Sequence, residues 1–330
     1  MIMRKIFIHS YDDIISLENL LLAWKNFKSD KSDKKDVQIF QRNLMENLLG
    51  LHRDLKTKSY KHSGYFAFKI SDTKPRDIHK ALVRDRVLHH ALYQKMYFFF
   101  DQKFISDSYS CRKWKGTHKS INQFKCYFQK VSKNNTKTCF VLKCDIRKFF
   151  ANIDHKILID ILSKSILDKD ILWLLTDIIQ SFNTKRKINI GLPLGNLTSQ
   201  LLINIYMNEF DQFVKHRLKV KYYIRYADDF VILSQDKIYL EDILKQMKEF
   251  LENDLKLTMH PNKVFIKTIS SGVDFLGWVH FPKHRVLRTS TKKRMFRNIT
   301  NNQKLNTIAS YLGMLGHGNG YKLKKSLKML

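Results

Sequence analysis

Two adjacent carboxylates, Asp228 and Asp229, lie between two apolar runs that favour β-strands. The runs are residues 222–225 and 231–233. This pattern predicts a hairpin with both carboxylates at its tip. Asp is a common turn residue, so the pair by itself is weak evidence for a site. Carboxylate oxygens are nevertheless the ligands that hard divalent cations prefer, and a pair of such cations promotes nucleotidyl transfer.

A third carboxylate, Asp145, ends an apolar run at residues 140–144 that predicts a buried strand. After it, Asp154 is a candidate N-cap for a helix, because the apolar residues that follow have helical spacing. These are Ile157, Leu158, Ile161 and Leu162. The segment therefore predicts a strand, an acid at its end, and a helix.

A glycine-containing turn at residues 191–196 leads into a second helix between the two acidic sites. Thr198 or Ser199 is the expected N-cap of this helix. One apolar face is predicted, formed by Leu202, Ile205, Tyr206, Phe210, Phe213 and Val214. A further helix after the hairpin has its core positions at Leu240, Ile243, Leu244, Met247, Phe250 and Leu251.

This order of strand, helices, hairpin and helix predicts a split βαβ sheet of the ferredoxin-like type. In such a sheet the first strand lies beside the hairpin, so Asp145 and Asp228 are expected to share metal ions. One face of the sheet is expected to remain open for a duplex.

The chain resembles a reverse transcriptase over most of its length. The first acidic segment, 144–150, the glycine segment, 192–200, and the hairpin, 225–229, are similar to motifs of that family and follow its order. Residues 74–78, 85–87, 108–112, 115–118 and 261–263 extend the similarity. The resemblance implies an α+β right-hand polymerase fold with a ferredoxin-like palm. It places amino-terminal helices and fingers at 1–135, the palm at 136–284 and a short, basic, helical thumb at 285–330.

The resemblance also implies catalytic roles for Asp145, Asp228 and Asp229. The first two aspartates would bridge two Mg²⁺ ions, the Ile146 carbonyl would add a ligand and Asp229 would assist. Mn²⁺ is a possible substitute, because both metals take oxygen ligands.

Further residues are implied in substrate binding. Lys74 and Arg76 would meet the triphosphate, although both are also ordinary solvated cations in so basic a chain. Lys263 would protonate pyrophosphate, with the same alternative. Phe150 would exclude the ribose 2′-hydroxyl, unless it merely packs in the core beside Phe149. The nucleotide would also contact Leu194, Gly195 and Gln200, and the primer would be gripped by Phe275, Leu276, Gly277 and Trp278.

Within the family, the chain looks most similar to the enzymes of diversity-generating retroelements and to related antiphage-defence enzymes. Leu194 stands where other relatives have glutamine, and Gln200 follows Ser199 where they have proline. Leu194 lacks an amide to hydrogen-bond the nucleotide, and the resemblance implies low fidelity opposite template adenines. Expected partners are an RNA template, a primer-template duplex, deoxynucleotides, a structured noncoding RNA and an accessory protein.

Composition independently favours a polyanionic partner, because 60 Lys and Arg against 30 Asp and Glu give a formal charge of +30. No apolar run reaches membrane-spanning length, so no membrane partner and a cytoplasmic location are expected. A noncatalytic RNA-binding protein is an alternative, but it would not need all of the aspartates. An RNA-directed RNA polymerase is another, disfavoured by Phe150 at the sugar position.

Overall fold

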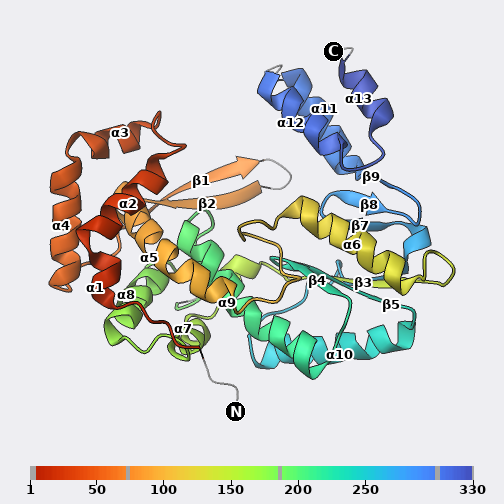
Figure 1. Cartoon of the computed structure of the whole chain (residues 1–330), viewed down its shortest axis with the longest axis horizontal. Helices are drawn as coiled ribbons and strands as arrows, with labels where there is room; N and C mark the ends of the chain where they lie inside the picture. The colour runs from red at the N-terminus through yellow and green to blue at the C-terminus, as the bar shows by residue number, and fades with distance from the viewer. Residues whose placement is uncertain (1–4, 72–74, 185–187, 302–304, 329–330) are drawn as a thin grey trace.

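The computed structural model describes residues 5–71, 75–184, 188–301 and 305–328. Lys74, predicted to bind the triphosphate, lies outside the described residues. The chain is arranged in three parts (Figure 1): amino-terminal helices with a hairpin, a central sheet with its helices, and the carboxyl-terminal helices.

The amino-terminal part packs around one long helix, α5 (Val83–Asp101). The helices that contact it are α1 (Tyr11–Ile15), α2 (Leu17–Lys28), α3 (Lys35–Arg42) and α4 (Leu44–Lys56). The hairpin β1 (Tyr65–Ser71) and β2 (Pro75–Ala81) extends from them towards the middle of the molecule (Figure 1). Arg76 lies on β2 opposite Ile70.

The central sheet has the strand order β4-β5-β3-β6 and is antiparallel throughout. Its strands are β3 (Phe140–Asp145), β4 (Tyr223–Tyr226), β5 (Asp229–Ser234) and β6 (Phe265–Thr268). Helices α7 (His155–Ser163), α8 (Lys169–Gln180) and α9 (Leu197–Gln212) join β3 to β4, and α10 (Lys237–Asn253) joins β5 to β6. This is the predicted ferredoxin-like arrangement. Asp154 caps α7 by accepting from the Ile157 amide at 3.0 Å, as predicted.

The prediction of an open sheet face is wrong, because both faces are buried. Leu142 and Ile232 belong to the core formed with α9 and α10. Val141 and Val231, which point the opposite way, belong to a second core with α6 (Thr117–Val131) and the carboxyl-terminal elements. Burial on two faces explains why these strands are continuous apolar runs rather than alternating ones.

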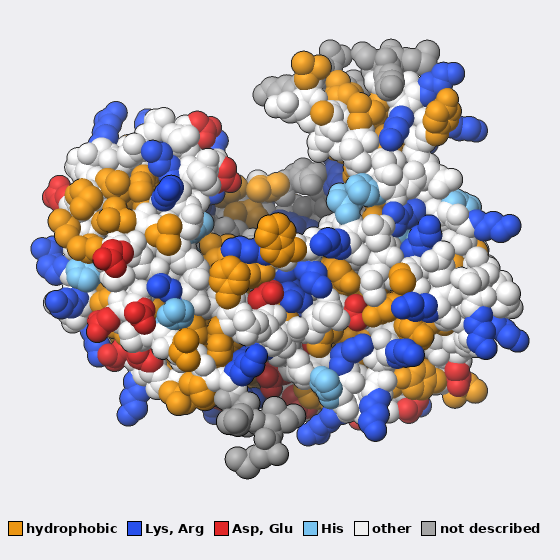
Figure 2. Space-filling model, in the orientation of Figure 1, with side chains coloured by type: hydrophobic (Ala, Val, Ile, Leu, Met, Phe, Trp, Pro, Cys, Tyr) orange, Lys and Arg blue, Asp and Glu red, His pale blue; other side chains and the backbone are white. Residues whose placement is uncertain are grey.

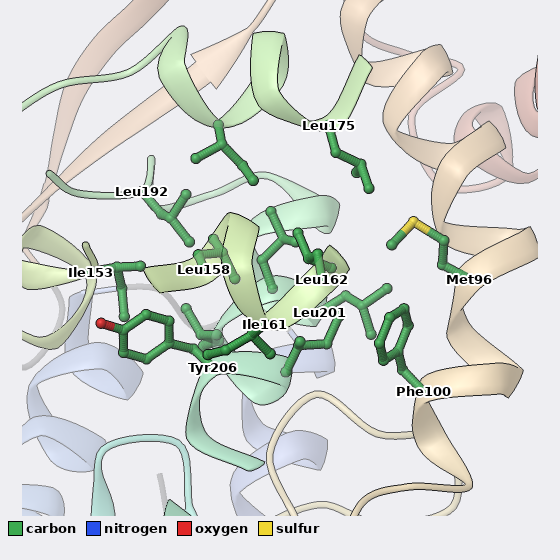
Figure 3. Packing of buried hydrophobic residues seen from close by; sticks show 14 of the residues in the cluster. Met96, Phe100, Ile153, Leu158, Ile161, Leu162, Leu175, Leu192, Leu201 and Tyr206 are labelled. Carbon is green, nitrogen blue, oxygen red and sulfur yellow. The ribbon is translucent and has the colours of Figure 1, made fainter. Parts of the chain in front are cut away.

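Helix α9 differs from its prediction at its start and in its surroundings. It begins at Leu197 with Asn196 as N-cap, so Thr198 and Ser199 are inside the first turn. The Asn196 side chain instead bonds the backbone of β2, donating to the His79 carbonyl at 2.8 Å. The helix is buried on nearly every side rather than along one face, because α5, α7 and the sheet enclose it. Figure 3 shows Leu201 and Tyr206 of α9 among side chains from those neighbouring helices.

A second, three-stranded antiparallel sheet follows, made of β7 (Val273–Phe275), β8 (Trp278–His280) and β9 (Arg285–Leu287). Helices α11 (Thr289–Asn301), α12 (Leu305–Leu315) and α13 (Tyr321–Lys328) complete the chain. None of the described helices is long and apolar enough to cross a membrane.

Candidate active site

The hairpin that carries Asp228 and Asp229 has a turn of only two residues. Tyr226 pairs with Asp229, which leaves Ala227 and Asp228 as the two-residue turn. Ala227 adopts a left-handed conformation with φ +55°, which a residue with a side chain enters at some cost. The Ile146 amide donates to the Asp228 carbonyl at 3.1 Å. The turn is therefore fixed against the end of β3.

Strand register brings the acids together. Asp145, the last residue of β3, lies directly opposite Asp229 on β5. The Asp145 carbonyl accepts from the His260 amide at 2.7 Å, so the segment before β6 supports this end of the sheet. All three predicted carboxylates line one cleft. Their grouping depends on the ferredoxin-like strand order, because they come from separate elements of the sequence.

Two lysines neutralise part of this negative charge. The Lys263 ammonium lies 2.7 Å from Asp145 Oδ1, and the Lys143 ammonium lies 3.3 Å from Asp229 Oδ2. Lys263 was expected near the phosphates and here pairs with a metal-ligand candidate. Lys143 was not predicted as a site residue. Its signal in the sequence is a single charged residue inside an otherwise apolar strand.

The two lysines do not fully compensate the negative charge of Asp228 and Asp229, whose pKa values remain raised. Burial, followed by the charge of Asp145, raises the pKa of Asp228. Burial raises the pKa of Asp229 to about 7 despite the opposing effect of Lys143. Asp229 Oδ1 is also buried without a hydrogen-bond partner. Oxygen donors whose charge is unfavourable until a cation arrives fit a Mg²⁺ site. In the described part of the chain, however, no group of three or more His, Cys, Asp or Glu is already arranged to hold a metal ion.

The raised pKa of Asp229 predicts how the stability of the metal-free chain depends on pH. In the unfolded chain an aspartate titrates near pH ~4. The protonated carboxyl therefore favours the folded state at low pH, and this stabilisation is lost as the pH rises from about 4 to about 7. We expect the free energy of unfolding to fall by on the order of 3 kcal/mol across that window from this group. Denaturant unfolding in a chelator, followed from pH 4.5 to 8, measures the loss.

The control for that experiment is a pair of variants. Asp229→Asn removes the titrating group and should flatten the pH dependence. Asp242→Asn, at an exposed carboxylate on α10, should keep it. An equally steep fall in Asp229→Asn would show that the dependence arises elsewhere.

The carboxylates line a cleft of about 550 Å³, a size that suits a nucleotide. Figure 2 shows the molecule hollowed between the amino-terminal part and the carboxyl-terminal helices. Predicted residues that line the cleft besides the acids are Arg76, Phe150, Leu194, Gly195, Gln200, Leu276, Gly277 and Trp278. Ile146, Lys263 and Phe275 do not line it. Phe275 is fully buried, with its ring centroid 5.5 Å from that of Phe124, so only the other members of the predicted primer grip face the cleft.

The two phenylalanines after Asp145 have different environments. Phe149 is buried, whereas Phe150 is half-buried and lines the cleft. Their rings pack edge to face, with centroids 5.8 Å apart. The Phe150 carbonyl accepts from the Leu192 amide at 2.8 Å, which ties this short 3₁₀ segment to the glycine segment. Phe150, rather than Phe149, is therefore the phenylalanine that is exposed to the cleft.

The glycine segment is attached to β2. The His79 amide donates to the Leu194 carbonyl at 2.9 Å. Gly195 has φ +113°, and a Cβ atom there would lie 2.8 Å from Cγ2 of Ile78. Any larger residue would therefore meet both a strained backbone and a neighbouring side chain. Close approach of the β1–β2 hairpin explains why this position is glycine.

A buried ion pair that was not predicted as part of the site links the hairpin to α9. Arg225 is fully buried and donates to both Asp211 oxygens, at 2.8 Å and 2.7 Å. It also donates to the Ala227 carbonyl at 3.1 Å, so one guanidinium joins α9 to the turn that carries Asp228. The signal in the sequence is an arginine within an apolar strand. Such a residue needs a partner on another element.

The carboxyl-terminal part closes the cleft on the side opposite β2. Arg288, Thr291, Arg294 and Met314 line it there. Arg288, Thr291 and Met314 were not predicted individually, whereas Arg294 belongs to the basic stretch predicted in the thumb. The sequence indicated only that the region is basic and helical.

The fold and this arrangement of carboxylates define a right-hand nucleotidyl-transfer enzyme. A family model described as reverse transcriptase (RNA-dependent DNA polymerase) matches residues 68–280, more than half of the chain. The chain belongs to this family, whose enzymes are RNA-directed DNA polymerases, and the predicted α+β right-hand fold is confirmed.

Known proteins are similar to the chain along much of its length. Protein YkfC of Escherichia coli is 26% identical over 284 residues, which cover 74% of this chain and 72% of that protein. The putative COX1/OXI3 intron 2 protein of Saccharomyces cerevisiae is 22% identical over 346 residues, which cover 85% of this chain and 39% of that protein. The group II intron-encoded protein LtrA of Lactococcus lactis is 27% identical over 216 residues, which cover 46% of this chain and 35% of that protein. The chain thus spans well under half of the two intron proteins.

Proposed function

We propose that the chain copies an RNA template into complementary DNA by two-metal nucleotidyl transfer. The observation that carries this proposal is the grouping of Asp145, Asp228 and Asp229 at one end of the sheet, inside a nucleotide-sized cleft. Family membership supports the reaction class. The division into fingers at 1–135, palm at 136–284 and thumb at 285–330 is part of the proposal.

Asp145 and Asp228 would hold two Mg²⁺ ions together with the Ile146 carbonyl, and Asp229 would assist them. The metals would supply activation of the primer hydroxyl and stabilisation of the leaving pyrophosphate. Lys263 and Lys143 now pair with the carboxylates. Because metal ions would take over the charge of the carboxylates, Lys263 would be released to protonate pyrophosphate.

Positioning of the nucleotide would rest on the walls of the cleft. Arg76 on β2 would meet the triphosphate with its planar fork. Leu194, Gly195 and Gln200 would contact the base and sugar from the glycine segment. Leu276, Gly277 and Trp278 would hold the primer end, with Phe275 anchoring their hairpin in the core.

Replacement of Phe150 by alanine is expected to relax sugar selection. The ring lines the cleft, and its removal opens space for a 2′-hydroxyl. The steric penalty of about 2–3 kcal/mol that the ring imposes on ribonucleotides would then disappear. The preference for deoxynucleotides would fall by roughly 30–150-fold. The measurement is the ratio of kcat/KM for a deoxynucleotide and the matching ribonucleotide. Phe149→Leu, a change at the buried neighbour, is the control, and unchanged discrimination in Phe150→Ala would remove the gate assignment.

For the biological role, we propose a diversity-generating retroelement with low fidelity at template adenines. Leu194 supports this, because no side-chain amide at that position can hydrogen-bond the incoming nucleotide. A structured noncoding RNA and an accessory protein would be its partners. The alternative is an antiphage-defence enzyme that works with a dedicated noncoding RNA.

Sequencing of cDNA made on a defined RNA template tests both the proposed polymerase activity and the proposed retroelement role. Chelator-sensitive cDNA supports the polymerase, and errors concentrated opposite adenines support the retroelement role. Evenly distributed errors would favour the defence alternative. Failure to produce cDNA with the native RNA supplied would contradict the polymerase itself.

A further inference from the structure

Two large aromatic side chains outside the active cleft are exposed to solvent. Trp114 is 84% exposed and Phe98 is 60% exposed. Tryptophan usually buries most of its large apolar surface, and three other tryptophans in this chain are buried or half-buried. The high exposure of Trp114 therefore favours a role in binding a partner.

The fold holds Trp114 in this position. Its backbone is left-handed, with φ +64°, a conformation that needs support from its surroundings. The Lys113 amide donates to the Tyr97 hydroxyl at 2.6 Å, and Arg112 Nε donates to Asp101 Oδ1 at 2.7 Å. The tryptophan thus projects from a loop anchored to α5 rather than from a loose segment.

The residue before Trp114, Lys113, places its ammonium over two aromatic rings of α5. The Lys113 ammonium is 4.7 Å from the centroid of the Phe98 ring and 5.4 Å from that of Tyr97. Among the described residues no carboxylate lies within 4.0 Å of this ammonium, whereas the Arg112 guanidinium next to it is paired.

This surface adjoins the active cleft without being part of it. Cys111 and Thr117, on either side of the loop, line the cleft, but Phe98, Lys113 and Trp114 do not. A strand that enters or leaves the cleft on this side would pass the exposed rings.

We propose that Trp114, Phe98 and Lys113, here called the loop platform, bind an unpaired stretch of RNA outside the cleft. A base would stack on the indole or phenyl ring, and a phosphate would meet the Lys113 ammonium. The formal charge of +30 favours a polyanion over a protein partner. The choice of RNA rests on the proposed function, because the template of this family is RNA.

The test is binding of a fluorescein-labelled oligoadenylate of about 12 nucleotides, a length within the usual range of single-strand sites. Stacking contributes about 1–3 kcal/mol per base, so Trp114→Ala is expected to weaken binding about tenfold. Trp114→Phe keeps an aromatic face and should stay within about threefold of the wild type. Ile238→Ala, at a 77% exposed side chain on α10, is the matched control. Lys113→Ala should lower the salt dependence of binding by about one counterion.

Intrinsic fluorescence provides an independent readout. Titration with the oligonucleotide should quench the wild type more than Trp114→Phe, because the indole at 114 would stack on a base. Unchanged RNA affinity in Trp114→Ala, with equal quenching in Trp114→Phe, would overturn the proposal. So would an equal loss of affinity for a fully paired RNA duplex, whose bases cannot reach the rings. The assay needs no catalysis, so a failure of the proposed polymerase activity would not be confused with a failure of the loop platform.

Discussion

The Asp228→Asn variant is expected to lose primer extension by at least about 10³-fold while keeping its affinity for RNA. The side chain lies at the turn that β3 fixes in place, and an amide cannot supply the negative charge that two metal ions require. Stabilisation of charge by such ions amounts to several kcal/mol of the barrier, and each ~1.4 kcal/mol is tenfold in rate. RNA binding depends on Lys and Arg contacts instead. Single-turnover extension and filter binding measure the two quantities.

The matched control is Asp242→Asn, which removes an equal charge at an exposed position of α10. It should extend primers like the wild type. Extension by Asp228→Asn within about tenfold of that control would remove Asp228 from the metal site. A parallel loss of RNA binding would instead indicate that the variant is misfolded or that the aspartate supports the RNA surface.

The Asp211→Ala variant is expected to lose about 3–5 kcal/mol of unfolding free energy, because it leaves the Arg225 guanidinium charged and buried without its counterion. Both side chains are fully buried. The Tyr223 hydroxyl, which donates to Asp211 Oδ1 at 2.8 Å, loses its acceptor as well. Urea unfolding measures the effect.

A second variant separates charge from packing. Arg225→Met combined with Asp211→Leu replaces the ion pair by apolar groups and should be far more stable than Asp211→Ala, because no buried charge remains. It should nevertheless extend primers more slowly, since the bond from Arg225 to the Ala227 carbonyl is lost. Equal stability of the two variants would mean that the unpaired charge is not the source of the destabilisation.

The sheet and its acids could be predicted because each local signal agrees with the final arrangement. Apolar runs that end in Asp145 and begin after Asp229 identify strands, and the intervening helices fix their order. Asp154 as a helix cap is a similarly local signal. Residues 140–145 and 229–234 are buried on both faces, however, and a continuous apolar run does not tell which elements cover each face. The expectation of an open face failed for that reason.

The start of α9 and the ion pairs depended on contacts distant in sequence. Thr198 and Ser199 are intrinsically good caps, but Asn196 is held by β2, more than a hundred residues earlier. Lys143 and Arg225 were visible only as charges in apolar strands. Their partners, Asp229 and Asp211, could not be assigned until the strands and α9 had been placed.

The most direct test of the central claim is the choice of sugar during extension of a DNA primer on an RNA template with Mg²⁺. The wild-type chain, with its native RNA partner supplied, is given all four deoxynucleotides in one reaction and all four ribonucleotides in another. We expect full-length DNA that is absent with a chelator, and little or no extension with ribonucleotides. Ribonucleotide products of similar yield would identify an RNA polymerase. The absence of product with either set of nucleotides would contradict polymerase activity and favour a protein that binds RNA without copying it.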